Sequence, residues 1–136
     1  MRRKTLVTLL VFVLFFVGLL YARENRIGLG NGGPASPRLL YPIYDTVTLT
    51  GSAPLEFRWI NDFTLTDHFI FKLYKGYNMY ESTLIKKQNI PSGDSSVKIE
   101  SDLFEDGKVY TWSIIRVATG GEKSDKSFNS FKVIRK

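Results

Sequence analysis

Residues 103–112 read Leu103-Phe104-Glu105-Asp106-Gly107-Lys108-Val109-Tyr110-Thr111-Trp112. This stretch places Leu103, which we expect in the core, before a tight turn at Asp106 and Gly107, and Tyr110 then enters a strand. A buried tyrosine needs a partner for its hydroxyl group, and the backbone of the preceding turn can supply one. The stretch therefore predicts a corner at which the chain bends between two β-strands.

Apolar residues recur at every second position on both sides of this corner, which is typical of strands with one buried face. The alternation is clearest in five groups: Leu55, Phe57 and Trp59; Phe69, Phe71 and Leu73; Val97 and Ile99; Tyr110, Trp112 and Ile114; and Phe131 and Val133. After an extended piece at 39–44, strands are predicted near 46–50, 54–60, 68–75, 80–87, 95–100, 108–118 and 127–134. Their short connections favour antiparallel neighbours. The sequence predicts an all-β, seven-stranded antiparallel β-sandwich.

The corner resembles the tyrosine corner of fibronectin type III domains. Three further stretches are similar to that family: Trp59 on the second strand, Tyr110-x-Trp112 in the penultimate strand, and Leu40-Tyr41-Pro42 at the opening. The resemblance covers residues 39–136 and implies a fibronectin type III-like (immunoglobulin-like) domain of bacterial exported or envelope proteins. Arg116 lies where the family usually has a small residue, so we expect a bulge near residues 115–117.

The N-terminus is basic and then apolar. Arg2, Arg3 and Lys4 precede residues 5–22, an uncharged stretch of 18 residues. As a helix it would be about 27 Å long, close to the thickness of a bilayer's hydrocarbon core. We expect one N-terminal hydrophobic helix over residues 1–22, which acts as an uncleaved signal-anchor. A cleaved signal peptide is the alternative, although Leu20-Tyr21-Ala22 has a large residue where a cleavage site prefers a small one.

The predicted location follows from this leader. The positive-inside rule keeps the basic end in the cytoplasm, so the rest of the chain crosses the membrane. We expect a single-pass protein of the inner (cytoplasmic) membrane with an extracytoplasmic C-terminal domain, or a secreted or periplasmic domain if the leader is cleaved. Residues 23–38 are rich in glycine and proline and are predicted to be a flexible linker.

Charge and cysteine content limit the partners. Outside the leader the chain has 16 basic and 13 acidic residues, and the basic ones are scattered. Nucleic-acid binders cluster their cations, so we expect no nucleic-acid partner. The chain has no cysteine, which excludes disulfides, thiolate metal sites, a cysteine nucleophile and a lipid-modified cysteine.

Few residues favour catalysis or metal binding. His68 is the single histidine, and Asp67 beside it is a conceivable partner. Glu100, Asp102, Glu105 and Asp106 are the best calcium candidates, but they lack the spacing of a dedicated loop. We therefore predict no catalytic residue, no cofactor and no metal site.

A surface remains as the candidate site. If the apolar residues of 69–73 and 110–114 point inward, then Ile70, Lys72, Tyr74 and Ile115 point outward on neighbouring strands, with Tyr77 and Tyr80 on the following loop. Such a patch is a partner-contact surface, whereas tyrosines that only cover an edge strand are the structural alternative. We expect a non-catalytic, membrane-tethered extracytoplasmic module that binds a protein partner of the cell envelope. A carbohydrate- or cell-wall-binding accessory domain is the first alternative, and a small secreted hydrolase is the second.

Overall fold

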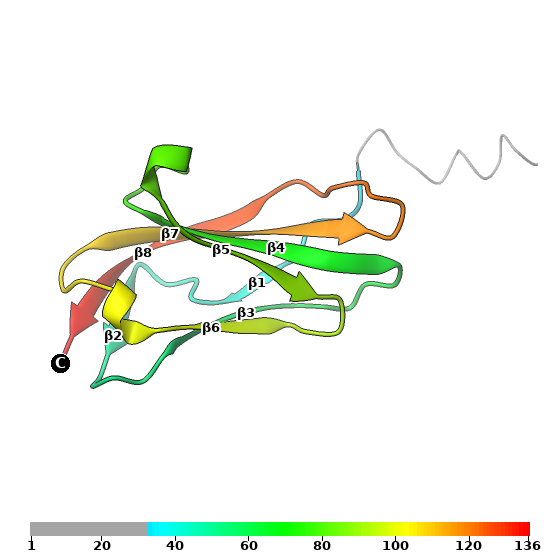
Figure 1. The fold of residues 1–136 in the computed structure, drawn as a ribbon. Coiled ribbons are helices and arrows are strands. Elements are labelled where there is room, and N and C mark those ends of the chain that lie inside the picture. The colour runs from blue at the N-terminus through cyan, green and yellow to red at the C-terminus, as the bar shows by residue number, and fades with distance from the viewer. Residues whose placement is uncertain (1–32) are drawn as a thin grey trace, which may run out of the picture. The chain divides into compact units, whose positions relative to one another are not determined.

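Two β-sheets lie face to face in the computed structural model, which describes residues 33–136 (Figure 1). The three-stranded sheet has the order β1 (Leu39–Tyr41), β3 (Leu55–Trp59), β6 (Ser96–Ile99). The five-stranded sheet has the order β2 (Thr46–Leu49), β8 (Ser127–Arg135), β7 (Val109–Ala118), β4 (Thr66–Lys75), β5 (Leu84–Pro91). Two 3₁₀ turns, η1 (Glu81–Thr83) and η2 (Ser101–Leu103), complete the described elements. The predicted all-β sandwich is confirmed, with eight strands in place of the predicted seven.

The predicted N-terminal hydrophobic helix lies outside the described residues. Within residues 33–136, no helix has the length and apolar character needed to cross a bilayer. Part of the predicted linker is described, and it packs on the sandwich. The Ser36 hydroxyl donates to the Asp125 carbonyl (2.9 Å), and the Ile60 N–H donates to the Arg38 carbonyl (2.8 Å).

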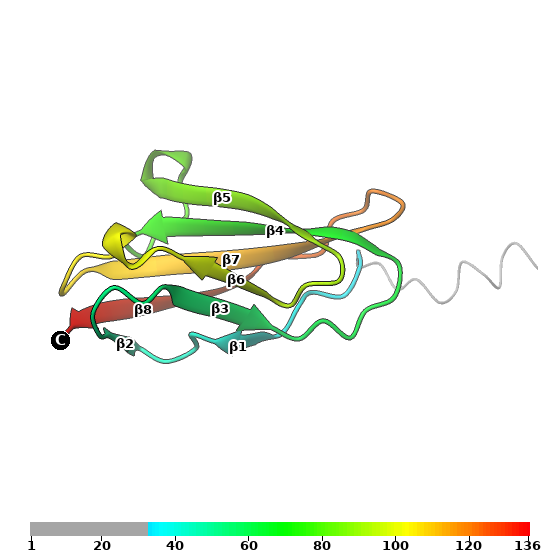
Figure 2. The ribbon, with the colours of Figure 1, turned by 60° about the horizontal axis from the view of Figure 1, so that its bottom comes forward.

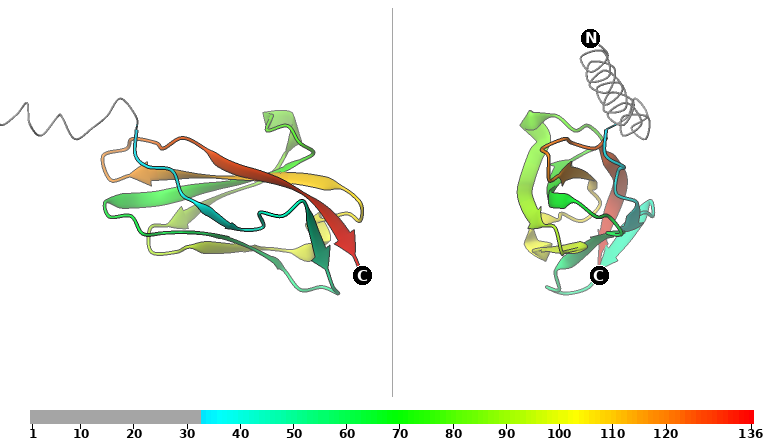
Figure 3. Two further views of the ribbon diagram at one scale, coloured as in Figure 1. Left: turned by 180° about the vertical axis from the view of Figure 1, so that it is seen from behind. Right: turned by 90° about the vertical axis from the view of Figure 1, so that its right-hand side faces the viewer.

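The extra strand is β1, because residues 39–41 of the predicted extended piece at 39–44 pair with β3 as a strand of their own. β1 pairs antiparallel with β3, whereas β2 pairs with β8 in parallel (Figure 3, left), so the expectation of antiparallel neighbours throughout is wrong at this edge. Pro42 lies between β1 and β2, in a cis peptide bond with Tyr41. Its carbonyl accepts hydrogen bonds from Trp112 Nε1 (2.9 Å) and Asn129 Nδ2 (3.1 Å), which hold the chain where it changes sheets. A parallel pair is possible here because the two strands are far apart in the sequence.

The fifth strand also begins later than predicted, at Leu84 in place of residue 80. Residues before it form η1, because the Thr83 hydroxyl accepts from the Tyr80 N–H (3.3 Å) and donates to the Asn78 carbonyl (2.9 Å). Such local bonds from a side chain to the backbone compete with strand pairing. β5 then runs to Pro91, so that Lys86 and Lys87 lie in its interior and not at its end.

Aromatic side chains fill the space between the sheets. Phe57 of β3 is fully buried, with its ring centroid 5.0 Å from that of Phe71 and 5.2 Å from that of Trp112. Trp59 packs edge-on to Phe69, with centroids 5.5 Å apart. Each aromatic side chain buries about 150–250 Å². Core packing therefore stabilises a domain that has no disulfide.

The tyrosine corner is present. The Tyr110 hydroxyl accepts a hydrogen bond from the Glu105 N–H (2.8 Å) and donates to the Leu103 carbonyl (3.3 Å). Its ring is 1% exposed and packs edge-on to Phe104, with centroids 5.0 Å apart. Phe104 is therefore the core residue of the corner. The expectation that Leu103 fills this place is wrong, since Leu103 ends η2 and is 38% exposed.

Arg116 points inward and closes one end of the sandwich. Its Nε donates to Thr66 Oγ1 (2.8 Å), a second nitrogen donates to the Thr64 carbonyl (2.8 Å), and the guanidinium lies 4.4 Å from the ring centroid of Phe63. The predicted bulge is not in residues 115–117 themselves. Against β4, the register shifts between Thr66 and His68. On the other side of β7, Ile114 pairs with Ser127 and Val117 pairs with Lys123. Three steps along β7 therefore correspond to four steps along the facing segment, so the extra residue lies in that segment.

Candidate functional site

The candidate surface is the outer face of the five-stranded sheet, which is turned away from the three-stranded sheet (Figures 1 and 2). Strand register brings its residues together: Ile70 of β4 lies directly opposite Ile115 of β7. Lys72 lies opposite Ser113, and Ser113 lies opposite Phe128 of β8. We use the term outer face for these five residues.

Three apolar side chains of the outer face form one group. Ile70 and Ile115 are half-buried neighbours, and Phe128 is diagonal to Ile115 and 57% exposed. Diagonal neighbours in a sheet are within reach of an aromatic side chain. Sequence reasoning missed Phe128, although the alternation that turns Phe131 inward also turns Phe128 outward. We refer to Ile70, Ile115 and Phe128 as the apolar triangle.

Ser113 lies beside this triangle and is 1% exposed. Its hydroxyl has no hydrogen-bond partner within residues 33–136. The hydroxyl groups of the next outward pair, Thr111 and Ser130, by contrast lie 2.6 Å apart and bond to each other. Solvent therefore does not reach the Ser113 side chain at the centre of the outer face, although this face points away from the core.

Lys72 and Tyr74 are less available than the sequence suggests. Lys72 Nζ lies 3.4 Å from Glu81 Oε1 of η1, the turn that rises beside the sheet in Figure 1. Tyr74 is 1% exposed, so the expectation that its side chain forms part of the contact surface is wrong. Thr111 lies opposite Tyr74 and donates to the Gly76 carbonyl (2.7 Å), which draws the turn after Tyr74 over this end of the sheet.

The two loop tyrosines lie where a partner can reach them. Tyr77 is 72% exposed and Tyr80 is 61% exposed, both in the connection between β4 and β5. The Thr83 hydrogen bonds hold this connection in a defined turn. Of the six residues proposed from the sequence, the structure therefore places Ile70, Lys72 and Ile115 on the outer side of the sheet and Tyr77 and Tyr80 on the adjoining loop. Tyr74 also points to the outer side but is buried there.

Charged groups elsewhere make structural contacts. His68 Nδ1 lies 2.6 Å from Asp67 Oδ2, and the pair is exposed to solvent. Asp106 Oδ1 accepts from the Arg135 N–H (2.8 Å), which ties the turn before β7 to the end of β8. Within residues 33–136, no three His, Asp or Glu side chains gather closely enough to hold a metal ion.

Lys75 and Glu105 form an ion pair between the end of β4 and the corner segment. Lys75 Nζ lies 2.7 Å from Glu105 Oε1. The hydrogen bond from Lys75, together with its charge, lowers the pKa of the Glu105 carboxyl below 4.5. The same hydrogen bond raises the pKa of Lys75 above 10.5. Both groups are therefore charged at neutral pH.

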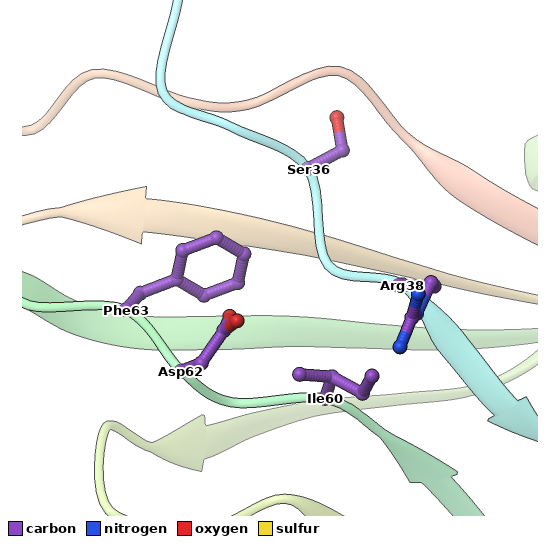
Figure 4. A pocket seen from close by; sticks show the side chains of 5 residues that line it. All are labelled: Ser36, Arg38, Ile60, Asp62 and Phe63. Carbon is purple, nitrogen blue, oxygen red and sulfur yellow. The ribbon is translucent and has the colours of Figure 1, made fainter.

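A hollow of about 280 Å³ lies near the start of the domain (Figure 4). It is lined by Ser36, Arg38, Ile60, Asp62 and Phe63. Its polar side chains are exposed, and the Ser36 hydroxyl already donates to Asp125. Arg116 lies behind Phe63 and directs its nitrogens to Thr64 and Thr66. The hollow therefore lacks the buried polar groups that orient a small ligand.

Comparisons with known proteins identify the fold. No protein-family model matches the sequence, and neither does any curated protein. A computationally redesigned β-sandwich protein is similar in structure, with a TM-score of 0.52 and 9% identity over 79% of this chain and 98% of that one. The fn3 domain of human contactin 1 is similar too, with a TM-score of 0.50 and 8% identity over 79% of this chain and 87% of that one. The chain thus has the β-sandwich fold of fibronectin type III domains, as the tyrosine corner predicted.

Proposed function

We propose that this chain is a non-catalytic, membrane-tethered extracytoplasmic module that binds a protein partner of the cell envelope. The fold alone does not determine a role, since sandwiches of this kind serve many functions. The proposal depends on the outer face and on the charged and apolar N-terminal stretch of the sequence.

The apolar triangle is the observation that carries the proposal. Phe128 is 57% exposed and diagonal to the half-buried Ile115, which pairs directly with the half-buried Ile70, in the middle of a sheet whose other face forms the core. Contiguous exposed apolar patches on soluble domains mark contact sites, whereas single apolar residues do not. Tyr77 and Tyr80 extend the surface, and tyrosine is enriched among residues that contribute strongly to protein interfaces.

The absence of catalysis is part of the proposal. His68 makes an exposed pair with Asp67, and the polar side chains that line the hollow at Arg38 and Asp62 are exposed. Neither arrangement offers the desolvated environment in which acid–base groups act. Hydrolysis of peptidoglycan, glycan or ester substrates by the purified chain would contradict this part of the proposal.

Photo-crosslinking in native cells tests the binding surface. Benzoylphenylalanine in place of Ile115 is expected to capture one discrete protein, because Ile115 lies in the apolar triangle. The matched control carries the same group at Lys98 of β6, an exposed position on the three-stranded sheet. Equal capture from both positions, or none from Ile115, would contradict the proposed surface.

Carbohydrate binding is the second candidate, favoured by the exposure of Tyr77 and Tyr80 on one loop. Flat aromatic rings with a polar edge can stack on sugars. Titration with cell-wall glycans would then change tyrosine fluorescence, and the double substitution Tyr77→Ala, Tyr80→Ala would abolish the change. The matched control Tyr44→Ala removes another exposed tyrosine and would keep it. No response in the unmodified chain eliminates this candidate.

A further inference from the structure

β5 is an open edge of the five-stranded sheet. Among the strands of residues 33–136 it pairs with β4 alone, and it runs along the margin of its layer in Figure 2. All residues from Ile85 to Asn89 are exposed. Alternate residues of an edge strand direct their N–H and C=O groups away from the sheet, where another extended chain can pair with them.

Two adjacent lysines occupy the middle of this edge. Lys86 lies opposite Leu73 and Lys87 lies opposite Lys72, so Lys87 and Lys72 place two like charges side by side on the outer face. Within residues 33–136, the ion pairs engage Lys72 and Lys75 but neither Lys86 nor Lys87. Like charges directly opposite each other in a sheet are destabilising. An acidic neighbour would relieve this repulsion.

The same lysines disfavour a second copy of this chain as the neighbour. Full-length antiparallel pairing of two β5 strands places each Lys86 diagonal to the Lys87 of the other strand. Lysine on an edge strand is a known means of preventing such association. The charge pattern therefore disfavours self-pairing and at the same time favours an acidic segment.

We propose that β5 accepts an extended acidic segment of a partner protein as an added antiparallel strand. Consecutive lysines project to opposite faces of the sheet, so the added strand needs two consecutive Asp or Glu residues opposite Lys87 and Lys86. Apolar residues after this acidic pair would then lie opposite Ile85 and Leu84, at the end of β5 that follows Tyr80 and η1. This inference rests on the proposed protein-binding function and names the chemistry of the partner.

The probe is the peptide Thr-Val-Thr-Glu-Glu-Val-Val-Thr, added to the full chain in detergent. Hydrogen exchange followed by mass spectrometry or NMR reads the β5 amides. The amides that face the open edge exchange fast in the free chain and are expected to slow on binding, because the added strand accepts their hydrogen bonds. Binding should weaken as salt is added, because ions screen exposed charges.

Charge exchange gives the matched control. The double substitution Lys86→Glu, Lys87→Glu is expected to weaken peptide binding at least tenfold and to allow binding of the Lys-Lys counterpart of the peptide. Lys108→Glu, Lys123→Glu changes the net charge equally outside β5 and is expected to leave binding unchanged. Equal weakening in both double variants would overturn the inference.

Two other outcomes would also overturn it. Binding without slowed β5 amides would mean that the lysines attract any polyanion, such as an anionic glycan, without strand addition. Failure of the acidic peptide to bind, while Ile115 still crosslinks one protein, would refute the inference and leave the proposed function standing. Loss of the Ile115 crosslink alone would instead refute the proposed function.

Discussion

The hydroxyl of Tyr110 bonds to two backbone groups of the corner, and both lose their partner if it is removed. Tyr110→Phe is therefore expected to lower the free energy of unfolding by about 2 kcal/mol, since an unsatisfied buried group costs roughly 1–3 kcal/mol. Urea denaturation measures the difference. Tyr77→Phe, at a position 72% exposed, is the control and should change stability by less than about 0.5 kcal/mol. Equal effects of the two substitutions would refute the structural role of the corner.

Substitutions of Ser113 and Ser130 give a second comparison, because in the described part of the chain one hydroxyl has no partner and the other has one. Ser113→Ala removes a buried hydroxyl that has no partner within residues 33–136, so it is expected to raise the free energy of unfolding by about 1 kcal/mol. Ser130→Ala removes the partner of Thr111 and is expected to lower it by a similar amount, about 1 kcal/mol. Thermal or urea unfolding decides the sign. Destabilisation by Ser113→Ala as large as that by Ser130→Ala would contradict the account.

Sequence alternation shows the direction of a side chain but not what folds over it. Tyr74 points away from the core, as predicted, yet it is only 1% exposed, and the turn that follows it bonds to its neighbour Thr111 through the Gly76 carbonyl. Leu103 and Phe104 are adjacent apolar residues, and only the geometry of η2 determines which one enters the core. Tyr110 could be assigned from the sequence because its corner combines a turn signal with a polar group that must be satisfied.

At the scale of elements, the Lys75–Glu105 pair joins the end of β4 to the segment before β7. The pKa of Glu105 is lowered on folding, so its contribution is present above pH 4.5 and is lost as the pH falls through the lower folded value. The pKa of Lys75 is raised on folding, so the contribution of Lys75 to stability is present below pH 10.5 and is lost as the pH rises through the higher folded value. The pair is exposed, and salt therefore weakens it.

Glu105→Gln tests this pair while keeping the backbone N–H that bonds to Tyr110. The unmodified chain is expected to be more stable than the variant at neutral pH, and the difference should shrink in acid and in high salt. Urea unfolding across the acid range measures it. A difference that stays constant from neutral to strongly acidic pH would refute the electrostatic origin of the contribution.

Strand boundaries depended on local hydrogen bonds that a two-residue period does not contain. The period predicts the long strands β4 and β7 well, because each has several buried residues in alternation. β5 has one buried residue, Ile90, and Thr83 ends the preceding turn, so the period predicts a start at residue 80, four residues before the observed start at Leu84. The parallel pairing of β2 with β8 depends on the change of sheet at Pro42, which the sequence marks only as a proline.

For the whole molecule, the two-layer sandwich could be predicted from the alternation and the corner. The assembly of the outer face could be predicted only in part. Ile70 and Ile115 were expected on neighbouring strands, and the structure pairs them directly. The alternation alone does not single out Phe128, and the sequence does not show the role of Lys86 and Lys87, because that role depends on which strand forms the edge of the sheet.

The central claim is that the outer face of the five-stranded sheet binds a protein partner. The most direct test is the affinity of the full chain for the protein captured at Ile115, with Phe128→Ser compared with Leu40→Ser on the three-stranded sheet. Removing a residue that contributes strongly to an interface costs about 2 kcal/mol or more, which exceeds a tenfold change in affinity. We predict at least a tenfold loss for Phe128→Ser and no change for Leu40→Ser. Unchanged affinity of Phe128→Ser, or an equal loss in both variants, would contradict the claim.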